Sequence, residues 1–463
     1  MVSRLKSHEN NVHFADKMAP LDKRKLDHLL DVFFVRQHGT LLSRKEVSTF
    51  IMKQALGRKH TLEELLQLLE LRFKFNTSQN LKTNEAMTNR TKHVNTSSIK
   101  FGPIVKAERE NVIRFLSWTI KYYAFPHWFE NLGREPFKAC NTPIPCEYTE
   151  DRALYNTSDI ILIHPFYVTR KEHMPKYRFP HQKLLFFEQE APSRCRFNMK
   201  RYDSWFNVTC TYTSDADIVA PYGVCLPNRD TIRDNPGSIT PYIRQLYGPS
   251  AESAPWLSVV ETIQRSHNRA ADKSRLVAWM VSNCYTPSRR ATYVKLLKRH
   301  IAVDIYGKCG TMTCPHGDES CDIRMKTYKF YLAFENSLCP EYITEKVWRA
   351  LEQGVVPIVL GGADYNTYLP KHSYINVKDF TSPSELAKYL KVLDLNDTLY
   401  NEYFDWTKSY TCHSDVPATS LACNMCRHAN ENINKQETAD IISEFWSRKH
   451  CISPKQFYTG IVQ

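Results

Sequence analysis

The sequence lacks any apolar run long enough to cross a bilayer, which would need about 20 predominantly apolar residues. Its N-terminus also lacks the short apolar core of a secretory signal peptide. We therefore expect any membrane association to depend on an anchor that is absent from this chain.

Long basic runs are missing as well, although 62 lysines and arginines against 49 acidic residues give a formal charge of +13. The chain carries no RNA-binding signature and no recognisable DNA-reading helix. Positive charge spread in this way favours a phosphate-bearing small substrate over a nucleic acid. We expect no nucleic-acid partner.

What the chain does have is enough apolar material for packed cores. It contains 463 residues, of which 42% are hydrophobic and 12% aromatic. This length exceeds the size at which one core stops growing, so two globular domains with an appendage are expected. A wholly disordered chain is excluded.

Fourteen cysteines and six Asn-x-Ser/Thr sequons suggest an oxidising, glycosylating lumen. The alternative is chance, because a three-residue pattern recurs often in a long chain. The sequons are at Asn76, Asn89, Asn95, Asn156, Asn207 and Asn396.

Composition divides the chain into four parts. Residues 1–105 are polar and lysine-rich with one apolar helical pattern at 62–69, which indicates a stem or linker. Residues 106–265 and 272–430 are predicted α/β domains, with a hinge or surface connection at 248–255. Residues 431–463 are predicted to form a C-terminal helical tail.

Short apolar segments bounded by turn residues predict strands in both domains. In the first domain they are at 112–118, 159–164, 183–187 and 218–220. In the second they are at 276–281, 301–306, 330–334, 355–360 and 374–377, alternating with helices at 288–300, 342–353 and 383–393. This alternation favours a mostly parallel sheet, whose ligands lie beyond the carboxyl ends of its strands. At the last helix, Ser382 is the expected N-cap and Glu385 can close a capping box.

Segment 329–349 combines a strand, a polar loop and the start of a helix. On a helix over 342–353, Tyr342, Glu345 and Lys346 would share one side at i, i+3 and i+4. A nucleotide diphosphate sugar requires a cation for its pyrophosphate, a carboxylate for its ribose hydroxyls and a helix N-terminus. Taken in isolation, neighbouring Glu and Lys residues are more often an ordinary exposed pair.

Residues 328–406, including 356–361, 374–380 and 403–406, resemble the donor-binding motif of the α1,3-fucosyltransferases of glycosyltransferase family 10. The resemblance covers roughly residues 112–427. It implies an α/β fold of GT-B type, in which two Rossmann-like domains face each other across a cleft, here with a polar N-terminal stem. It also implies a place in the Golgi lumen or membrane.

The same resemblance assigns the donor site. It implies that Tyr342, Glu345 and Lys346 hold the nucleotide and pyrophosphate of GDP-fucose, and that Asn336 lies in the same pocket. Arg290 matches an arginine that pairs with the phosphates as a bidentate clamp.

Two glutamates after the predicted strand 183–187 are candidates for the catalytic base, because inverting transfer requires a carboxylate to take the proton of the acceptor hydroxyl. The family has Glu-Ser-Pro at this point, so Glu190, followed here by Ala191, aligns with its general base. Glu188 is the alternative. Thr213 stands where many members carry arginine, which leaves the acceptor preference open. The resemblance implies acceptors that present GlcNAc on glycoprotein or glycolipid glycans.

Two further motifs have structural readings. Asp215 and Asp217 resemble a metal-binding carboxylate pair, but we expect turn hydrogen bonding, because two cations already serve the pyrophosphate. No metal site and no required cofactor are predicted, and stimulation by Mn²⁺ or Mg²⁺ is compatible with this. Cys423 and Cys426 could be half of a zinc site or a redox pair, but no second CxxC follows, which favours disulfides.

The sequence thus predicts an inverting α1,3-fucosyltransferase. The alternatives are a non-catalytic glycan-binding protein with the same fold, and a transferase that uses another nucleotide sugar.

Overall fold

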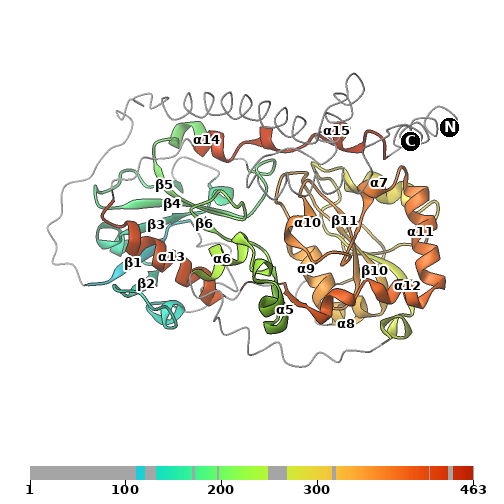
Figure 1. Cartoon of the computed structure of the whole chain (residues 1–463). Coiled ribbons are helices and arrows are strands. Elements are labelled where there is room, and N and C mark those ends of the chain that lie inside the picture. Colours follow the sequence, from blue (N-terminus) through green and yellow to red (C-terminus); the bar gives the residue numbers. More distant parts are fainter. Residues whose placement is uncertain are drawn as a thin grey trace, which may run out of the picture. The chain divides into compact units, whose positions relative to one another are not determined.

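The computed structural model describes residues 111–119, 132–168, 173–195, 198–248, 268–314, 320–414, 416, 418–435 and 442–461. The predicted stem 1–105 and nearly all of the predicted hinge 248–255 lie outside these residues. The described residues contain two parallel sheets with helices around them (Figure 1), which confirms the predicted α/β class of GT-B type. In this part of the chain, the helices are too short or too polar to cross a membrane.

The first sheet has the strand order β2-β1-β3-β4-β5-β6, and every neighbouring pair is parallel. Strands at the predicted positions are β1 (Ile113–Ser117), β3 (Ile160–Ile163), β4 (Lys183–Glu188) and β6 (Ile218–Val219). The sequence analysis missed β2 (Cys146–Thr149) and β5 (Phe206–Thr211). In β5 the polar side chains of Thr209 and Thr211 are buried, so the strand shows no clear hydrophobic pattern.

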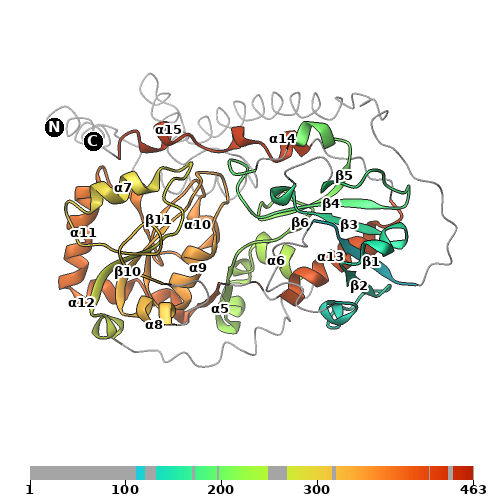
Figure 2. The same ribbon diagram turned by 180° about the vertical axis from the view of Figure 1, so that it is seen from behind.

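The second sheet has the order β12-β11-β10-β8-β9 and is also parallel throughout. Its strands are β8 (Arg275–Met280), β9 (Asp304–Tyr306), β10 (Tyr328–Phe334), β11 (Val356–Leu360) and β12 (Ile375–Asn376). Helices α7 (Arg290–Leu297), α9 (Glu345–Glu352), α11 (Pro383–Leu395) and α12 (Asp397–Glu402) surround it, as the reverse view shows (Figure 2).

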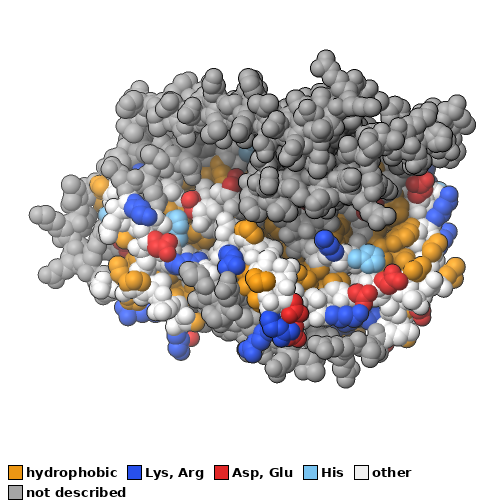
Figure 3. All heavy atoms as spheres, viewed as in Figure 1, with side chains coloured by type: hydrophobic (Ala, Val, Ile, Leu, Met, Phe, Trp, Pro, Cys, Tyr) orange, Lys and Arg blue, Asp and Glu red, His pale blue; other side chains and the backbone are white. Residues whose placement is uncertain are grey.

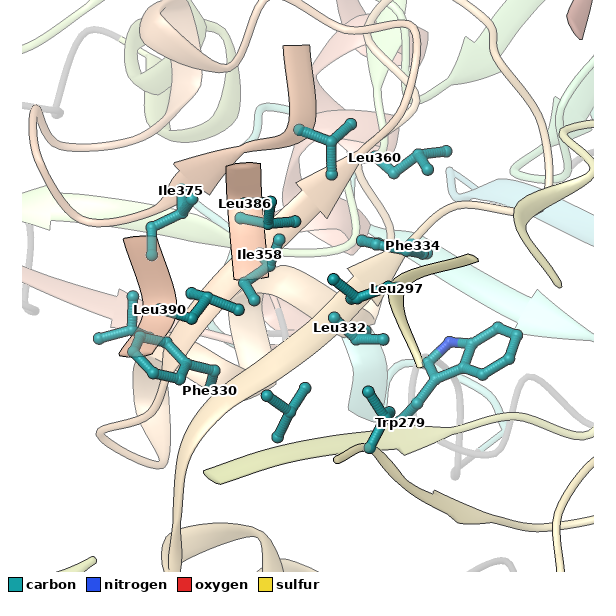
Figure 4. Close-up of a cluster of buried hydrophobic side chains, with 14 of the residues drawn as sticks. Trp279, Leu297, Phe330, Leu332, Phe334, Ile358, Leu360, Ile375, Leu386 and Leu390 are labelled. Carbon is teal, nitrogen blue, oxygen red and sulfur yellow. The ribbon is translucent and has the colours of Figure 1, made fainter. Parts of the chain in front are cut away.

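One core of the second sheet follows directly from the two-residue period of a strand. Phe330, Leu332 and Phe334 of β10 point to the same side, where they meet Leu297 of α7 and apolar side chains of α11 (Figure 4). The intervening Tyr331 and Ala333 belong to a second core that includes Val347 and Trp348 of α9. Because β10 is buried on both faces, its carboxyl end is held rigidly.

The capping box at α11 forms with a difference. The Ser382 hydroxyl accepts the Glu385 N–H at 3.3 Å, as predicted. The Glu385 carboxylate, however, reaches back to the Thr381 N–H and hydroxyl rather than to Ser382.

Disulfides tie distant parts of the described chain together. Helix α13 (Ala418–Asn432) is bonded through Cys423 to Cys140 and through Cys426 to Cys146 in β2. Both cysteines of the CxxC motif are therefore structural, which confirms the disulfide prediction. Cys225 in β7 (Val224–Pro227) is bonded to Cys412 in β13 (Tyr410–His413), and these two strands pair antiparallel.

The C-terminal segment, residues 442–461, contacts a strand of the first sheet and loops that adjoin the second sheet. Trp446, which follows α14 (Ile442–Phe445), stacks edge-on against Phe186 of β4. Cys451 is bonded to Cys339, and the hydroxyl of Tyr458 in α15 (Pro454–Tyr458) donates to the Ser288 carbonyl at 2.8 Å.

Candidate active site

The carboxyl end of β4 carries the two glutamates that the sequence singled out. Glu190 follows the strand by two residues, and its side chain is 32% exposed. Burial raises the pKa of Glu190, whereas the charges of Arg194 and Lys346 and a hydrogen bond to Asn336 lower it. A residue beyond β4 therefore lies beside residues that follow β10, almost 150 positions later in the chain.

Glu188 has a different environment, since its side chain is fully buried. Its two oxygens accept the backbone N–H groups of Glu190 at 2.9 Å and Phe166 at 3.0 Å. Burial raises the pKa of Glu188 to about 8. Glu188 thus anchors the turn that presents Glu190.

Lys346 lies in the first turn of α9, with its ammonium between two carboxylates. Its Nζ is 3.2 Å from Glu335 Oε2 and 3.1 Å from Glu345 Oε1. Burial, which lowers the pKa of Lys346, is outweighed by these two carboxylates, so that its pKa is raised. The side chain of Glu345 is 49% exposed, whereas that of Glu335 is 1% exposed.

Glu335 is the residue that sequence reasoning missed. It is the first residue after β10 and stands next to Asn336. The rule that ligands of parallel sheets lie beyond the strand ends, applied to the 330–334 strand, points to it directly. The sequence does not single it out, because a glutamate is almost never fully buried unless it is paired, and its partner is not evident from the sequence.

Tyr342 corrects the predicted helix. Helix α9 begins at Glu345, not at residue 342, so Tyr342 is not on one helix face with Glu345 and Lys346. Tyr342 is 1% exposed and packs against Tyr212 and Tyr222, which come from the other side of the site. The helix starts late because the Thr344 N–H and hydroxyl bind Glu335 instead of continuing the helix backwards.

Arg290 is the first residue of α7 and is 4% exposed. Its guanidinium donates to the carbonyls of Phe334 and Asn283, whereas its buried Nε makes no hydrogen bond among the described residues. Burial lowers the pKa of Arg290, and the negative charge of Glu335 raises it. Arg289 before it has φ of 52°, a left-handed conformation that is strained for this residue type.

Asn336 and its neighbour connect the two parts of the site. The buried Asn336 Oδ1 makes no hydrogen bond within the described residues, and its backbone carbonyl accepts the Ser288 N–H at 2.9 Å. Ser193, three residues after Glu190, donates its hydroxyl hydrogen to the Ser337 hydroxyl at 2.6 Å. The six predicted site residues are therefore neighbours in space, and their roles remain predictions.

Of the Asp215/Asp217 pair, Asp217 is hydrogen-bonded to Thr209 in β5. Asp217 Oδ2 accepts the Thr209 N–H at 2.7 Å and the Thr209 hydroxyl at 2.8 Å. In the described ranges, no group of three or more His, Cys, Asp or Glu side chains is arranged to hold a metal ion.

A cavity of about 310 Å³ lies at the carboxyl ends of β1 and β2, lined by Ser117, Trp118, Glu150, Asp151 and Arg152. The Arg152 guanidinium lies 4.4 Å from the centre of the Trp118 ring. Because all strands of this sheet are parallel, the cavity is at the same edge as Glu190.

Comparison with known proteins gives consistent matches. Residues 108–223 match the model "Fucosyltransferase, N-terminal", and residues 270–445 match "Glycosyltransferase family 10 (fucosyltransferase) C-term". A 3-galactosyl-N-acetylglucosaminide 4-alpha-L-fucosyltransferase of Bos taurus is 36% identical over 306 residues, which are 65% of this chain and 74% of that protein. A 4-galactosyl-N-acetylglucosaminide 3-alpha-L-fucosyltransferase of Homo sapiens is 34% identical over 66% of this chain and 75% of that protein.

An Alpha-(1,3)-fucosyltransferase C of Drosophila melanogaster is 36% identical over 56% of this chain, although the match covers only 57% of that protein. A crystal structure of an alpha1,3-fucosyltransferase aligns with 74% of this chain and 96% of its own, at 16% identity and a TM-score of 0.41. From the family models and the bovine and human relatives, we conclude that the chain is a glycosyltransferase and belongs to family 10, the fucosyltransferases.

Proposed function

We propose that this protein is an inverting α1,3-fucosyltransferase that transfers L-fucose from GDP-β-L-fucose to a GlcNAc residue of glycoprotein or glycolipid glycans. The observation that carries the proposal is the position of Glu190. It is partly exposed and close enough to Asn336, Glu345 and Lys346 for those residues to affect its pKa. A base and a donor site must be neighbours in a direct displacement.

The proposed reaction is one displacement. Glu190 removes the proton from the acceptor hydroxyl while that oxygen bonds to the anomeric carbon of fucose. The bond between that carbon and the phosphate oxygen breaks on the opposite side, and GDP leaves with the electron pair. The configuration at the anomeric carbon is inverted, and the proton ends on the Glu190 carboxylate.

Three groups are available to the diphosphate of the donor. The first is the ammonium of Lys346, and the second is the Nε of Arg290, which makes no hydrogen bond to any residue that the structure describes. The third is the N-terminus of α9, because Thr344 makes no side-chain cap. Helix N-termini and guanidinium groups are both suited to phosphate oxygens. We assign the nucleotide contacts to Tyr342, Glu345 and Asn336.

For the acceptor we propose the edge of the first sheet, within residues 106–265, and for the donor residues 272–430. The cavity beside Trp118 supports this division, since it combines an aromatic face with charged side chains at the same sheet edge as Glu190. We assign residues 431–463 to a tail. On the face that Figure 3 shows, basic and acidic side chains are interspersed, which agrees with a small anionic donor rather than a nucleic acid as partner.

We also propose that the protein acts in the Golgi lumen. Twelve of the fourteen cysteines form six disulfides, which are the four described above together with Cys284–Cys309 and Cys314–Cys321, and disulfides persist in oxidising compartments. Cys195 and Cys210 are buried and do not belong to these six disulfides.

The test is a donor screen with GDP-fucose, GDP-mannose and UDP-sugars against lactosamine and N-glycan acceptors. We expect transfer only from GDP-fucose, with the opposite anomeric configuration in the product by NMR. Transfer from another donor, or a retained configuration, would refute the assignment of donor or mechanism. Specific glycan binding without any transfer would instead identify a non-catalytic protein.

A further inference from the structure

The buried carboxylate of Glu335 has contacts that suggest more than a structural role. Its backbone is fixed on both sides, since its N–H donates to the Leu360 carbonyl at 2.8 Å and its own carbonyl accepts the Ser288 hydroxyl at 2.7 Å. The side chain accepts the Thr344 N–H at 2.8 Å and the Thr344 hydroxyl. Only Lys346, at 3.2 Å, brings a positive charge within ion-pair distance of it in the described chain.

A buried carboxylate is costly unless it is paired and hydrogen-bonded. For Glu335, Lys346 supplies the opposite charge and Thr344 supplies the hydrogen bonds, and both residues lie at the start of α9. The arrangement also has a consequence for Lys346. Its single positive charge faces two carboxylates, Glu335 and Glu345, so the three side chains together carry one negative charge when both carboxylates are ionised. Burial raises the pKa of Glu335, and the charge of Lys346 lowers it. Lys346 is therefore already ion-paired with these carboxylates in the empty donor site, before a diphosphate binds.

We propose that Glu335 is a positioning residue that holds the Lys346 ammonium in the empty donor site and competes with the diphosphate for it, which keeps the GDP product weakly bound. This inference rests on the proposed donor site. The diphosphate and Glu335 are both negative and share one cation, so each weakens the attraction of the other to Lys346. A site without this competition would retain GDP after transfer.

The test is Glu335→Gln in the full chain. The amide keeps the size of the side chain and can still bond Thr344, but it has no charge to offer Lys346. We expect GDP to inhibit the variant at least about 10-fold more strongly. A tenfold change in affinity corresponds to about 1.4 kcal/mol of binding free energy. We expect kcat to fall and KM for the donor to fall with it, because product release slows.

A merely structural role gives the opposite result, since a disturbed turn would weaken GDP binding. Glu352→Gln is the matched control, because it removes the same charge from an exposed position of the same helix. We expect it to leave GDP inhibition unchanged. Glu335→Asp, which keeps the charge but withdraws it by one methylene, should shift GDP inhibition in the same direction to a smaller degree and serves if the Gln variant does not fold.

A double-mutant cycle with Lys346→Ala tests whether the effect passes through the lysine. We expect Glu335→Gln to lose most of its tightening effect in the Lys346→Ala background. Unchanged or weaker GDP binding by a folded Glu335→Gln variant overturns this inference alone. A wild-type protein that neither binds GDP nor transfers fucose overturns the proposed function instead.

Discussion

Glu188 and Glu190 are two positions apart and chemically identical, yet their surroundings assign them different tasks. Both oxygens of Glu188 are bonded to backbone amides in a closed interior. Glu190 is partly exposed beside the donor residues. Side chains in a strand alternate, but past the strand end only the turn decides where a residue points.

We expect Glu190→Gln to abolish transfer while preserving GDP-fucose binding, and Glu188→Gln to have the milder effect on transfer. The amide keeps the shape of the base but cannot take the proton, and a positioned general base typically contributes ~10²–10⁴ in rate. Initial rates and donor affinity on a mixed acceptor panel measure both. Normal turnover by Glu190→Gln together with an inactive Glu188→Gln would move the base by two residues.

Lys346→Ala and Arg290→Ala should each weaken GDP binding, because each removes a charge-assisted contact worth about 1.5–3 kcal/mol. Calorimetry with GDP measures the loss, and circular dichroism checks that the fold is kept. If neither folded variant changes the affinity, these residues do not belong to the donor site.

The raised pKa of Glu188, to about 8, predicts a pH dependence of stability. The folded protein retains this proton above the pH at which the unfolded chain has lost it, so stability falls as pH rises toward 8. The slope is at most about 1.4 kcal/mol per pH unit. Burial lowers the pKa of His164 to about 3. Its effect is that stability rises with pH, and this effect is confined to pH values below the ordinary pKa of 6.5.

Denaturant unfolding between pH 6.5 and 8, compared between the wild type and Glu188→Gln, measures the contribution of Glu188. We expect the free energy of unfolding of the wild type to decrease over this range and that of Glu188→Gln to decrease less. Equal slopes would show that Glu188 ionises in the folded protein as it does in the unfolded chain.

At the scale of elements, α13 depends on covalent bonds as well as on packing. Cys140–Cys423 and Cys146–Cys426 have sequence separations of 283 and 280, so together these two disulfides remove much of the freedom of the unfolded chain. The helix also packs Leu421, Met425 and Ala429 into a core with the first sheet. Helix α13 is thereby attached to a sheet whose strands all precede it by about 200 residues or more in the sequence.

We expect the variant in which Cys140, Cys146, Cys423 and Cys426 are all replaced by Ser to lose at least about 2 kcal/mol of stability, because removal of one native disulfide commonly costs about 2–5 kcal/mol. Cys314→Ser/Cys321→Ser is the control, because that disulfide closes a separation of only 7 residues and should cost less by the loop-entropy argument. Unfolding in denaturant under non-reducing conditions compares them. An equal or larger loss in the control would mean that strain or packing, not loop closure, sets the contribution.

At the scale of the whole molecule, the site proposed for the donor predicts how activity depends on metal ions. We expect exhaustive EDTA treatment to reduce activity only in part, because we assign the diphosphate to cationic side chains and because Asp217 is hydrogen-bonded to Thr209. Transfer rates before and after treatment measure this. Complete loss that Mn²⁺ restores, with the same loss on mutation of Asp215 and Asp217, would establish a metal site there.

Much of this molecule could be predicted from local sequence. Apolar runs such as 330–334 and 355–360 form strands because both faces are buried, and Ser382 with Pro383 starts a helix by its own chemistry. The paired roles expected of Lys346 and Glu345 follow from their residue types, and the family resemblance was carried by contiguous motifs. These properties depend on neighbours in the chain.

The rest was decided by contacts between segments that are distant in sequence. Helix α9 begins three residues later than its pattern predicts because Thr344 binds a carboxylate nine positions earlier. Strand β5 forms around buried threonines because its neighbours supply the partners. The distinction between Glu188 and Glu190, the pairing of the cysteines and the place of Glu335 beside Lys346 have the same origin: burial and charge pairing depend on distances in space, which the order of residues along the chain does not contain.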